Sequence, residues 1–218
     1  MDDAPVELDD EHGHPGRGRP RWLSGALLVL AGVLVGALGT VGVLATRSSA
    51  PPDWGADAGF SRDMQTHHAQ AVEMALLVRD RSRDEELRTV AYDIATSQQQ
   101  QAGQMYGWLV QWGLPQTASR PPMAWVGDEH GEAHAKPDGT MPGLATPDQL
   151  DELRSADGVE AERLFLQLMI AHHEGGVAMA EAAVAQARTD EVRTLAAAIV
   201  AAQSSEIELL ERMLADRS

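Results

Sequence analysis

Residues 64–75, MQTHHAQAVEMA, and residues 169–180, MIAHHEGGVAMA, decide the fold because both carry the pattern Met-x-x-His-His followed by Met-Ala. The two segments are 105 residues apart, and the correspondence continues without a gap from Met64 to Leu109 in the first copy. Internal repetition at one fixed spacing indicates two copies of a single supersecondary unit. The chain is therefore predicted to contain a duplicated unit.

Each copy is predicted to form a helical hairpin. In the first copy the helices cover about residues 61–81, with Ser61 as N-cap, and 85–112, ended by Gly113. In the second copy they cover about residues 158–188 and 190–216, with Thr189 as a cap. One hairpin cannot bury its apolar face alone, whereas two packed hairpins can. We therefore expect an all-α four-helix bundle, with hairpins at 59–113 and 158–216 and a connector loop at 114–157.

Residues 22–46, WLSGALLVLAGVLVGALGTVGVLAT, contain no charged residue and exceed the roughly 20 apolar residues that cross a bilayer. Arg17, Arg19 and Arg21 precede this stretch and only Arg47 closely follows it, so the positive-inside rule puts the N-terminus in the cytoplasm. We expect a disordered cytoplasmic tail (1–21), an N-terminal transmembrane helix (22–46), a linker (47–58) and an extracytoplasmic body. A cleaved signal peptide is the alternative.

The composition excludes several classes of function. The chain has 33 acidic and 17 basic residues and a net charge of −16, which argues against a nucleic-acid partner because phosphate binding needs a basic surface. It has no cysteine, so disulfides and thiolate metal sites are excluded and any soft metal ligand must be methionine. No pattern for catalysis by serine, cysteine or tyrosine and no phosphate-binding loop occurs, so we expect no catalytic residues of these kinds.

Methionine and histidine share one face of the first helix in each copy. Residues spaced by three, four and ten positions lie on the same side of a helix, which predicts one stripe in each repeat. Gln101 and Glu206 occupy equivalent inward positions on the second helices, where an unpartnered polar group costs about 1–3 kcal/mol. The predicted metal ligands are Met64, His67, His68, Met74, Met169, His172, His173, Met179 and Glu206.

Imidazole combined with thioether favours copper, above all Cu(I), and leaves zinc or iron as alternatives. A di-iron bundle would carry glutamate three residues before a histidine, but Met64 and Met169 occupy those positions. Two other functions stay open, which are a structural or partner-binding bundle with a His/Gln polar core and a di-metal oxidase. A homo-oligomer also stays open. In the connector, Met123, His130, His134 and Met141 could bind metal or belong to a solvated linker.

With the two Met-x-x-His-His motifs and the later Gln203-x-x-Glu206-Ile207, the body from about Asp57 to Leu214 resembles the domain-of-unknown-function 305 family. The resemblance implies a ferritin-like four-helix bundle, exported or membrane-anchored in bacteria. Some members resemble periplasmic copper-binding proteins with Met and His ligands, which implies copper sequestration or tolerance through the two stripes. The first repeat departs from the family pattern, because Gln101 stands where a glutamate is expected.

Overall fold

The computed structural model describes residues 32–37, 50–126, 136 and 139–217. Residues 50–218 form one compact unit. Its helices are α2 (Ala56–Arg81), α3 (Glu85–Trp112), α4 (Pro147–Ser155), α5 (Gly158–Gln186) and α6 (Asp190–Ala215). The described residues contain no strand, which confirms the all-α prediction.

The predicted transmembrane segment, residues 22–46, lies largely outside the described residues, and residues 32–37 within it are helical. Among the helices of the described residues, none has both the length and the apolar character that crossing a membrane requires. The transmembrane helix is therefore not confirmed.

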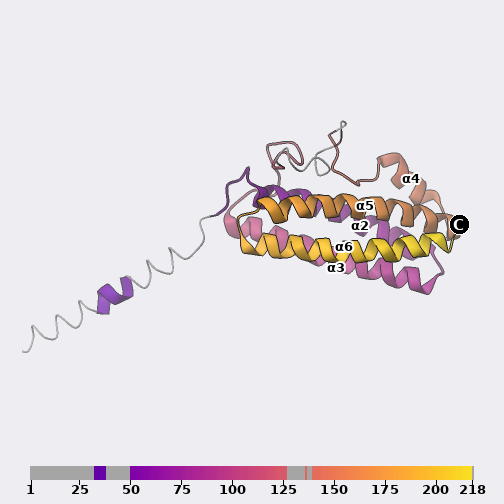
Figure 1. The fold of residues 1–218 in the computed structure, drawn as a ribbon, viewed down its shortest axis with the longest axis horizontal. Helices are drawn as coiled ribbons and strands as arrows, with labels where there is room; N and C mark the ends of the chain where they lie inside the picture. Colours follow the sequence, from indigo (N-terminus) through magenta and orange to yellow (C-terminus); the bar gives the residue numbers. More distant parts are fainter. Residues whose placement is uncertain (1–31, 38–49, 127–135, 137–138, 218) are drawn as a thin grey trace, which may run out of the picture. The chain divides into compact units, whose positions relative to one another are not determined.

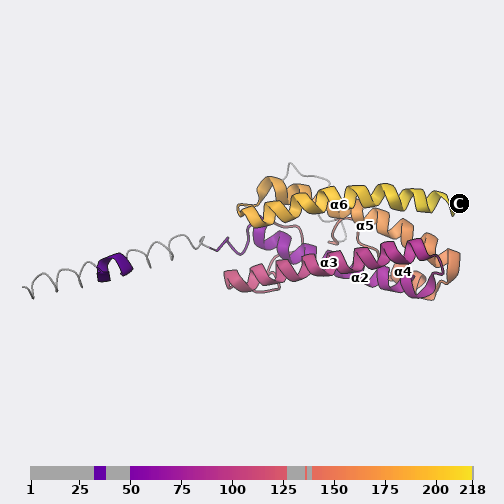
Figure 2. The same cartoon turned by 90° about the horizontal axis from the view of Figure 1, so that it is seen from below.

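Two helical hairpins form the bundle, as the repeat predicts. Helix α2 packs on α3 and α5 packs on α6, and the hairpins meet mainly through α2 and α5. In Figure 1, α2 and α5 lie between α4 on one side and α3 with α6 on the other. Figure 2 shows the two hairpins from below, with α6 beside α5 and α3 beside α2. Because α2 and α5 carry the two Met-x-x-His-His motifs, their contact brings the motifs together inside the fold.

The ends of the helices agree only in part with the prediction. Gly113 ends α3 in the left-handed conformation with φ of 69°, where glycine has no steric penalty. Helix α2 begins at Ala56, so the prediction of Ser61 as N-cap is wrong. The Ser61 hydroxyl donates instead to the Asp57 carbonyl oxygen at 2.7 Å, inside the helix. The last two helices end at Gln186 and Ala215, within two residues of the prediction.

Two buried acids at equivalent positions of the repeat, Asp57 and Glu162, each fix the turn of the other hairpin. Asp57 accepts hydrogen bonds from the backbone N–H of Arg188 at 3.1 Å and from the Thr189 N–H and hydroxyl at 2.8 Å. Glu162 accepts from the Ser82 hydroxyl at 2.5 Å and from Arg217 Nε at 2.8 Å. Thr189 is the N-cap residue of α6, as predicted, but its side chain makes no capping bond to its own helix.

The connector between the hairpins is more ordered than the predicted loop. It contains α4, which begins with Pro147 after a capping box formed by Thr146 and Gln149. The Gln70 amide both donates to the Ala145 carbonyl at 3.0 Å and accepts from the Ala145 N–H at 2.7 Å. These long-range bonds hold the end of the connector along α2.

The interpretation of the connector as a solvated linker is wrong for two of its methionines. Met123 and Met141 are only 2% and 3% exposed. Asp63 fixes the first half of the connector, because its carboxylate accepts from the Met123 N–H and from Trp125 Nε1, both at 2.8 Å. His130 and His134 lie outside the described residues.

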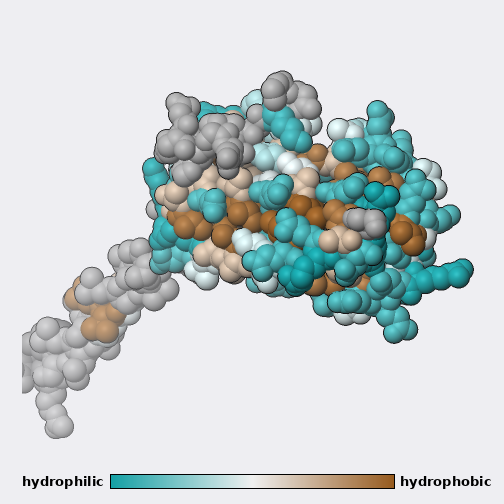
Figure 3. All heavy atoms as spheres, turned by 45° about the vertical axis from the view of Figure 1, so that its right-hand side comes forward, coloured by the Kyte–Doolittle hydropathy of each residue, from teal (hydrophilic) through white to brown (hydrophobic). Residues whose placement is uncertain are grey.

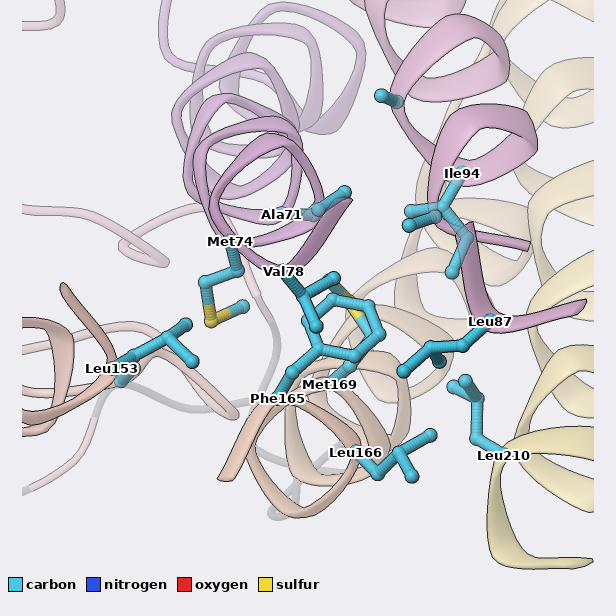
Figure 4. Close-up of a cluster of buried hydrophobic side chains, with 14 of the residues drawn as sticks. Ala71, Met74, Val78, Leu87, Ile94, Leu153, Phe165, Leu166, Met169 and Leu210 are labelled. Atoms are coloured by element: carbon cyan, nitrogen blue, oxygen red, sulfur yellow. The ribbon is translucent and has the colours of Figure 1, made fainter. Parts of the chain in front are cut away.

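The buried side chains of the bundle form two clusters. The aliphatic cluster includes Met74, Val78, Leu87, Phe165, Leu166, Met169 and Leu210, several of which appear in Figure 4. The methionine cluster includes Phe60, Met64, Met105, Met123, Met141, Met179, Val192 and Ile199. Figure 3 shows that apolar side chains also reach the surface as a stripe along the bundle, bordered by hydrophilic residues.

Candidate metal centre

Four histidines form the centre of the contact between α2 and α5. His67, His68, His172 and His173 are all fully buried. The ring centroids of His67 and His172 are 3.7 Å apart, with 37° between the ring planes. These two residues occupy the same position in the two repeats, so the fold brings equivalent imidazoles into direct contact across the interface.

The hydrogen bonds of this central pair fix the position of the ring proton. His67 Nε2 lies 3.0 Å from the Pro142 carbonyl oxygen, and His172 Nε2 lies 3.0 Å from the His67 carbonyl oxygen. A carbonyl oxygen can only accept a hydrogen bond, so each Nε2 carries the proton and donates it. In a neutral imidazole of this tautomer, Nδ1 is an unprotonated lone pair.

The outer two histidines follow the same rule with partners on the second helices. His68 Nε2 lies 2.7 Å from Gln101 Oε1, and His173 Nε2 lies 2.7 Å from Glu206 Oε2. Gln101 and Glu206 were predicted to point inward, and each finds its partner on the neighbouring helix of its own hairpin. Both oxygens accept, so Nδ1 is again the unprotonated nitrogen.

None of the four Nδ1 atoms has a hydrogen-bond partner among the described residues, although all four are buried. A buried polar atom without a partner costs about 1–3 kcal/mol, so four of them at one place call for an explanation. Metal-binding histidines characteristically donate their second ring N–H to a carbonyl or carboxylate and direct the other nitrogen to the metal. The four imidazoles have the hydrogen-bonding pattern of such ligands.

Burial also favours the neutral form of three of these rings, His67, His68 and His172. Desolvation, with a smaller contribution from the neighbouring His68, lowers the pKa of His67 from 6.5 to about 3. Desolvation lowers the pKa of His68 from 6.5 to about 4, against the hydrogen bond to Gln101. Desolvation and the proximity of His67 hold the pKa of His172 well below its ordinary value. Because a proton competes with a metal for the lone pair, low pKa values favour metal binding near neutral pH.

Two buried glutamines, Gln98 and Gln203, complete the polar interior. Neither amide has a hydrogen-bond partner for its nitrogen or oxygen among the described residues. Gly176 makes room for Gln203, since a Cβ atom at position 176 would lie 2.3 Å from Gln203 Oε1. A polar core that served only to hold the bundle together would satisfy these groups internally. The hydrogen bonds of His68 and His173 fit a purely structural core, but the amides of Gln98 and Gln203, unpartnered among the described residues, do not.

The four predicted methionine ligands, Met64, Met74, Met169 and Met179, are fully buried but lie on two sides of the histidines. Met64 and Met179 belong to the methionine cluster, whereas Met74 and Met169 belong to the aliphatic cluster. Figure 4 shows Met74 and Met169 among aliphatic and aromatic carbon atoms. The two stripes therefore converge at their histidines, and each carries one thioether to either side of them.

Carboxylates take little part in this centre. In the part of the chain that the structure describes, no three His, Asp or Glu side chains are arranged to hold a metal ion together. Glu206, whose side chain is 29% exposed, contacts the site through His173. A zinc site with four nitrogen or oxygen ligands, or a carboxylate-bridged pair of irons, does not match this arrangement.

Several residues that position the site were not predicted from the sequence. Pro142 supplies the acceptor for His67, and Asp63 and Gln70 hold the connector that carries it. Asp57 and Glu162 could have been found by extending the repeat backwards from Met64, because they occupy equivalent positions. The contacts of Pro142 and Gln70 join residues 75 positions apart and have no local signal in the sequence.

Comparison with known proteins identifies relatives of the same fold. No curated protein matches the chain. A candidate secreted protein of family DUF305 from Streptomyces coelicolor is 47% identical, with a TM-score of 0.69 over 76% of this chain and 96% of that chain. A DUF305 fragment from Deinococcus radiodurans is 34% identical, with a TM-score of 0.61 over 77% and 98% of the two chains.

A third similar structure is CopM in its Cu(I)-bound form. It is 25% identical, with a TM-score of 0.57 over 73% of this chain and 96% of that chain. The model of the domain of unknown function DUF305 matches residues 57–214, which include both histidine motifs and both second helices. The chain therefore belongs to the DUF305 family.

Proposed function

We propose that this protein binds copper as its cargo, outside the cytoplasm, and thereby sequesters the metal. The observation that carries the proposal is the set of four buried imidazoles whose Nε2 atoms are hydrogen-bonded and whose Nδ1 atoms lack partners among the described residues. Unprotonated nitrogen and thioether sulfur together suit Cu(I). Zinc and iron are weaker candidates, because among the described residues no carboxylate joins the histidines in a group that could hold a metal ion.

His67 and His172 are the central ligands in this proposal, since their rings already lie against each other. Met64 and Met169 each precede a central histidine by three residues, which is a rise of roughly 4.5 Å along the helix. They are therefore the thioethers best placed to join the imidazoles. His68, His173, Met74 and Glu206 complete this set, whereas the predicted ligand Met179 lies in the methionine cluster and is left out of it.

Two relatives support copper. CopM was crystallised in Cu(I)-bound and Cu(II)-bound forms, and both structures are 25% identical to this chain. The relative from Streptomyces coelicolor, a candidate secreted protein, supports a location outside the cytoplasm. The charge-free stretch at residues 22–46 and the arginines before it lead us to propose a membrane anchor for the copper-binding domain.

A structural bundle with a polar core is the second candidate. The direct bonds from His68 to Gln101 and from His173 to Glu206 favour it, because they join neighbouring helices without any metal. The two candidates differ in their response to metal. A ligand that binds the folded state raises the melting temperature, whereas a purely structural core is indifferent to added Cu(I).

The test is a competition titration of the full chain with a chromophoric Cu(I) chelator under reducing conditions. The variant H67A/H172A should lose at least 100-fold in affinity, because both central nitrogens are removed. Leu166→Ala is the control, since it destabilises the bundle through the aliphatic cluster but removes no ligand. If H67A/H172A binds Cu(I) as tightly as the parent protein, the proposed site is wrong.

A further inference from the structure

The methionine cluster holds thioethers that the histidine site does not use. Met105 comes from α3, Met123 and Met141 come from the two described parts of the connector, and Met179 comes from α5. All four are at most 3% exposed. They converge from four separate segments of the chain into one apolar cluster, next to Met64 of the histidine stripe.

The backbone at Met123 shows that the connector is held in a costly conformation. Its φ of 63° makes it the one non-glycine residue with positive φ among the described residues. This conformation costs an ordinary residue about 1–2 kcal/mol. The Asp63 carboxylate stabilises it by accepting the Met123 N–H and, two residues later, the Trp125 indole N–H. A methionine that only filled space would need no such conformation.

The two ends of the bundle core differ in their content of methionine. Met105 corresponds to Leu210 in the repeat, so a leucine occupies the equivalent position in the aliphatic cluster. The connector adds two methionines to one end, whereas at the other end α4 contributes leucines, Leu150 and Leu153. Thioether sulfur is therefore concentrated where the connector closes over the bundle.

From this arrangement we propose that Met105, Met123, Met141 and Met179 form a second metal site, which binds one soft monovalent cation, Cu(I) or Ag(I), through thioether sulfur alone. Soft thioether ligands select such cations over zinc, magnesium or calcium. Four neutral ligands leave the positive charge uncompensated, and a buried charge needs a partner. Asp63, which is 8% exposed and bonded to the backbone of Met123, is the nearby carboxyl group that would supply this charge.

A cleft gives the cation a route toward this site. It has a volume of about 240 Å³, and its wall includes Asp53, Trp54, Asp63 and Trp125. Arg62 and Arg120 also line it, and Arg62 is bound by Asp53 and by the Pro115 carbonyl. Trp125 lines the cleft and also packs against Phe60 and the methionine cluster, so it links the two.

The test uses the nine methionines of the full chain, labelled with ¹³C at their methyl groups and titrated with Ag(I), which is diamagnetic. The methyl signals of Met105, Met123, Met141 and Met179 should shift together and saturate at one equivalent. The signal of Met213, which lies in the aliphatic cluster, is the internal control and should not move. Unchanged signals of Met123 and Met141 would overturn the proposal.

Two variants separate this site from the histidine site, on which it does not depend. M123L/M141L keeps the side-chain volume and should abolish the Ag(I)-induced shifts of Met105 and Met179. It should also lower the Cu(I) stoichiometry by one equivalent, whereas Met213→Leu should change neither. In H67A/H172A the shifts of the four methionines should persist, even if the proposed copper function fails. Full stoichiometry in M123L/M141L would contradict the thioether site.

Discussion

The two hairpins carry the same arrangement of histidines, but the hydrogen-bond acceptors of these histidines differ. In the first hairpin His68 donates to the amide of Gln101, and in the second His173 donates to the carboxylate of Glu206. His172 donates to the backbone of α2, whereas the equivalent His67 donates to Pro142 of the connector. Each of the four histidines has an oxygen acceptor at Nε2, and the acceptors are backbone carbonyl, amide and carboxylate oxygens.

The comparison shows which feature of the repeat is maintained by the fold. The acceptors vary in charge and in origin, but all of them leave Nδ1 unprotonated. At the central pair, the connector causes the difference in acceptor between His67 and His172. Gly143 lies so close to α5 that a Cβ atom there would be 2.5 Å from the Ala171 carbonyl oxygen, and this approach places Pro142 beside His67. The single connector thus converts a symmetric repeat into an asymmetric site.

The largest expected effect is acid unfolding of the metal-free protein. The folded pKa values of His67 and His68, about 3 and 4, lie below the ordinary 6.5 of the unfolded chain, and that of His172 is also lowered. The unfolded chain therefore gains protons first as the pH falls. The neutral histidines therefore contribute their full stabilisation above about pH 6.5. As the pH falls toward 4, the free energy of unfolding decreases by about 1.4 kcal/mol per pH unit for each histidine.

Urea denaturation at pH 7.5 and pH 5.0 measures this decline. His68→Gln in the first hairpin and His172→Gln in the second should each make the dependence less steep, because each removes one titrating group. A free energy of unfolding that stays constant between these two pH values would show that the histidines are not buried as described.

The next effect concerns the acids that fix the turns. Asp57→Ala should lower the free energy of unfolding by about 3 kcal/mol, because three donors lose a buried acceptor. Glu162→Ala should cost about 2 kcal/mol, since Arg217 retains its ion pair with Asp84. Thermal and urea unfolding measure both values. The control Asp190→Ala removes an exposed ion pair with Arg193 and should change stability by less than about 1 kcal/mol.

The repeat and the helices could be predicted from the sequence because both rest on local periodicity. Gly113 was recognised as a terminator for the same reason, and the capping box at Thr146 and Gln149 could have revealed α4. The start of α2 at Ala56 was missed because it depends on a tertiary contact, the binding of Asp57 to the second hairpin. A ferritin-like relationship stays a prediction.

The site could be predicted only in part. Met and His at helical spacing indicated two stripes, and the stripes do meet at His67 and His172. The separation of the thioethers into two clusters depends on how α2 and α5 pack, and spacing within one helix contains no information on that. The role of Pro142 depends on the path of the connector, which the sequence does not specify.

The smallest expected effect exchanges the acceptors of the two hairpins. Glu206→Gln keeps a hydrogen-bond acceptor for His173 but removes its charge, so the fold should persist and the Cu(I) affinity should fall about tenfold. Gln101→Glu should raise the affinity, because a carboxylate then faces His68 as well. Competition titration measures both changes. Equal affinities in the parent and both variants would show that the acceptors outside the imidazoles do not tune the site.

The most direct test is ¹⁵N NMR of histidine-labelled protein, recorded before and after one equivalent of Ag(I) is added in place of Cu(I). Before addition, His67 and His172 should each show a protonated Nε2 and an unprotonated Nδ1. After addition, the Nδ1 signals of these two residues should shift and show coupling to silver, while both Nε2 atoms stay protonated. Protons on Nδ1 in the metal-free protein, or silver coupling at Nε2, would contradict the proposed centre.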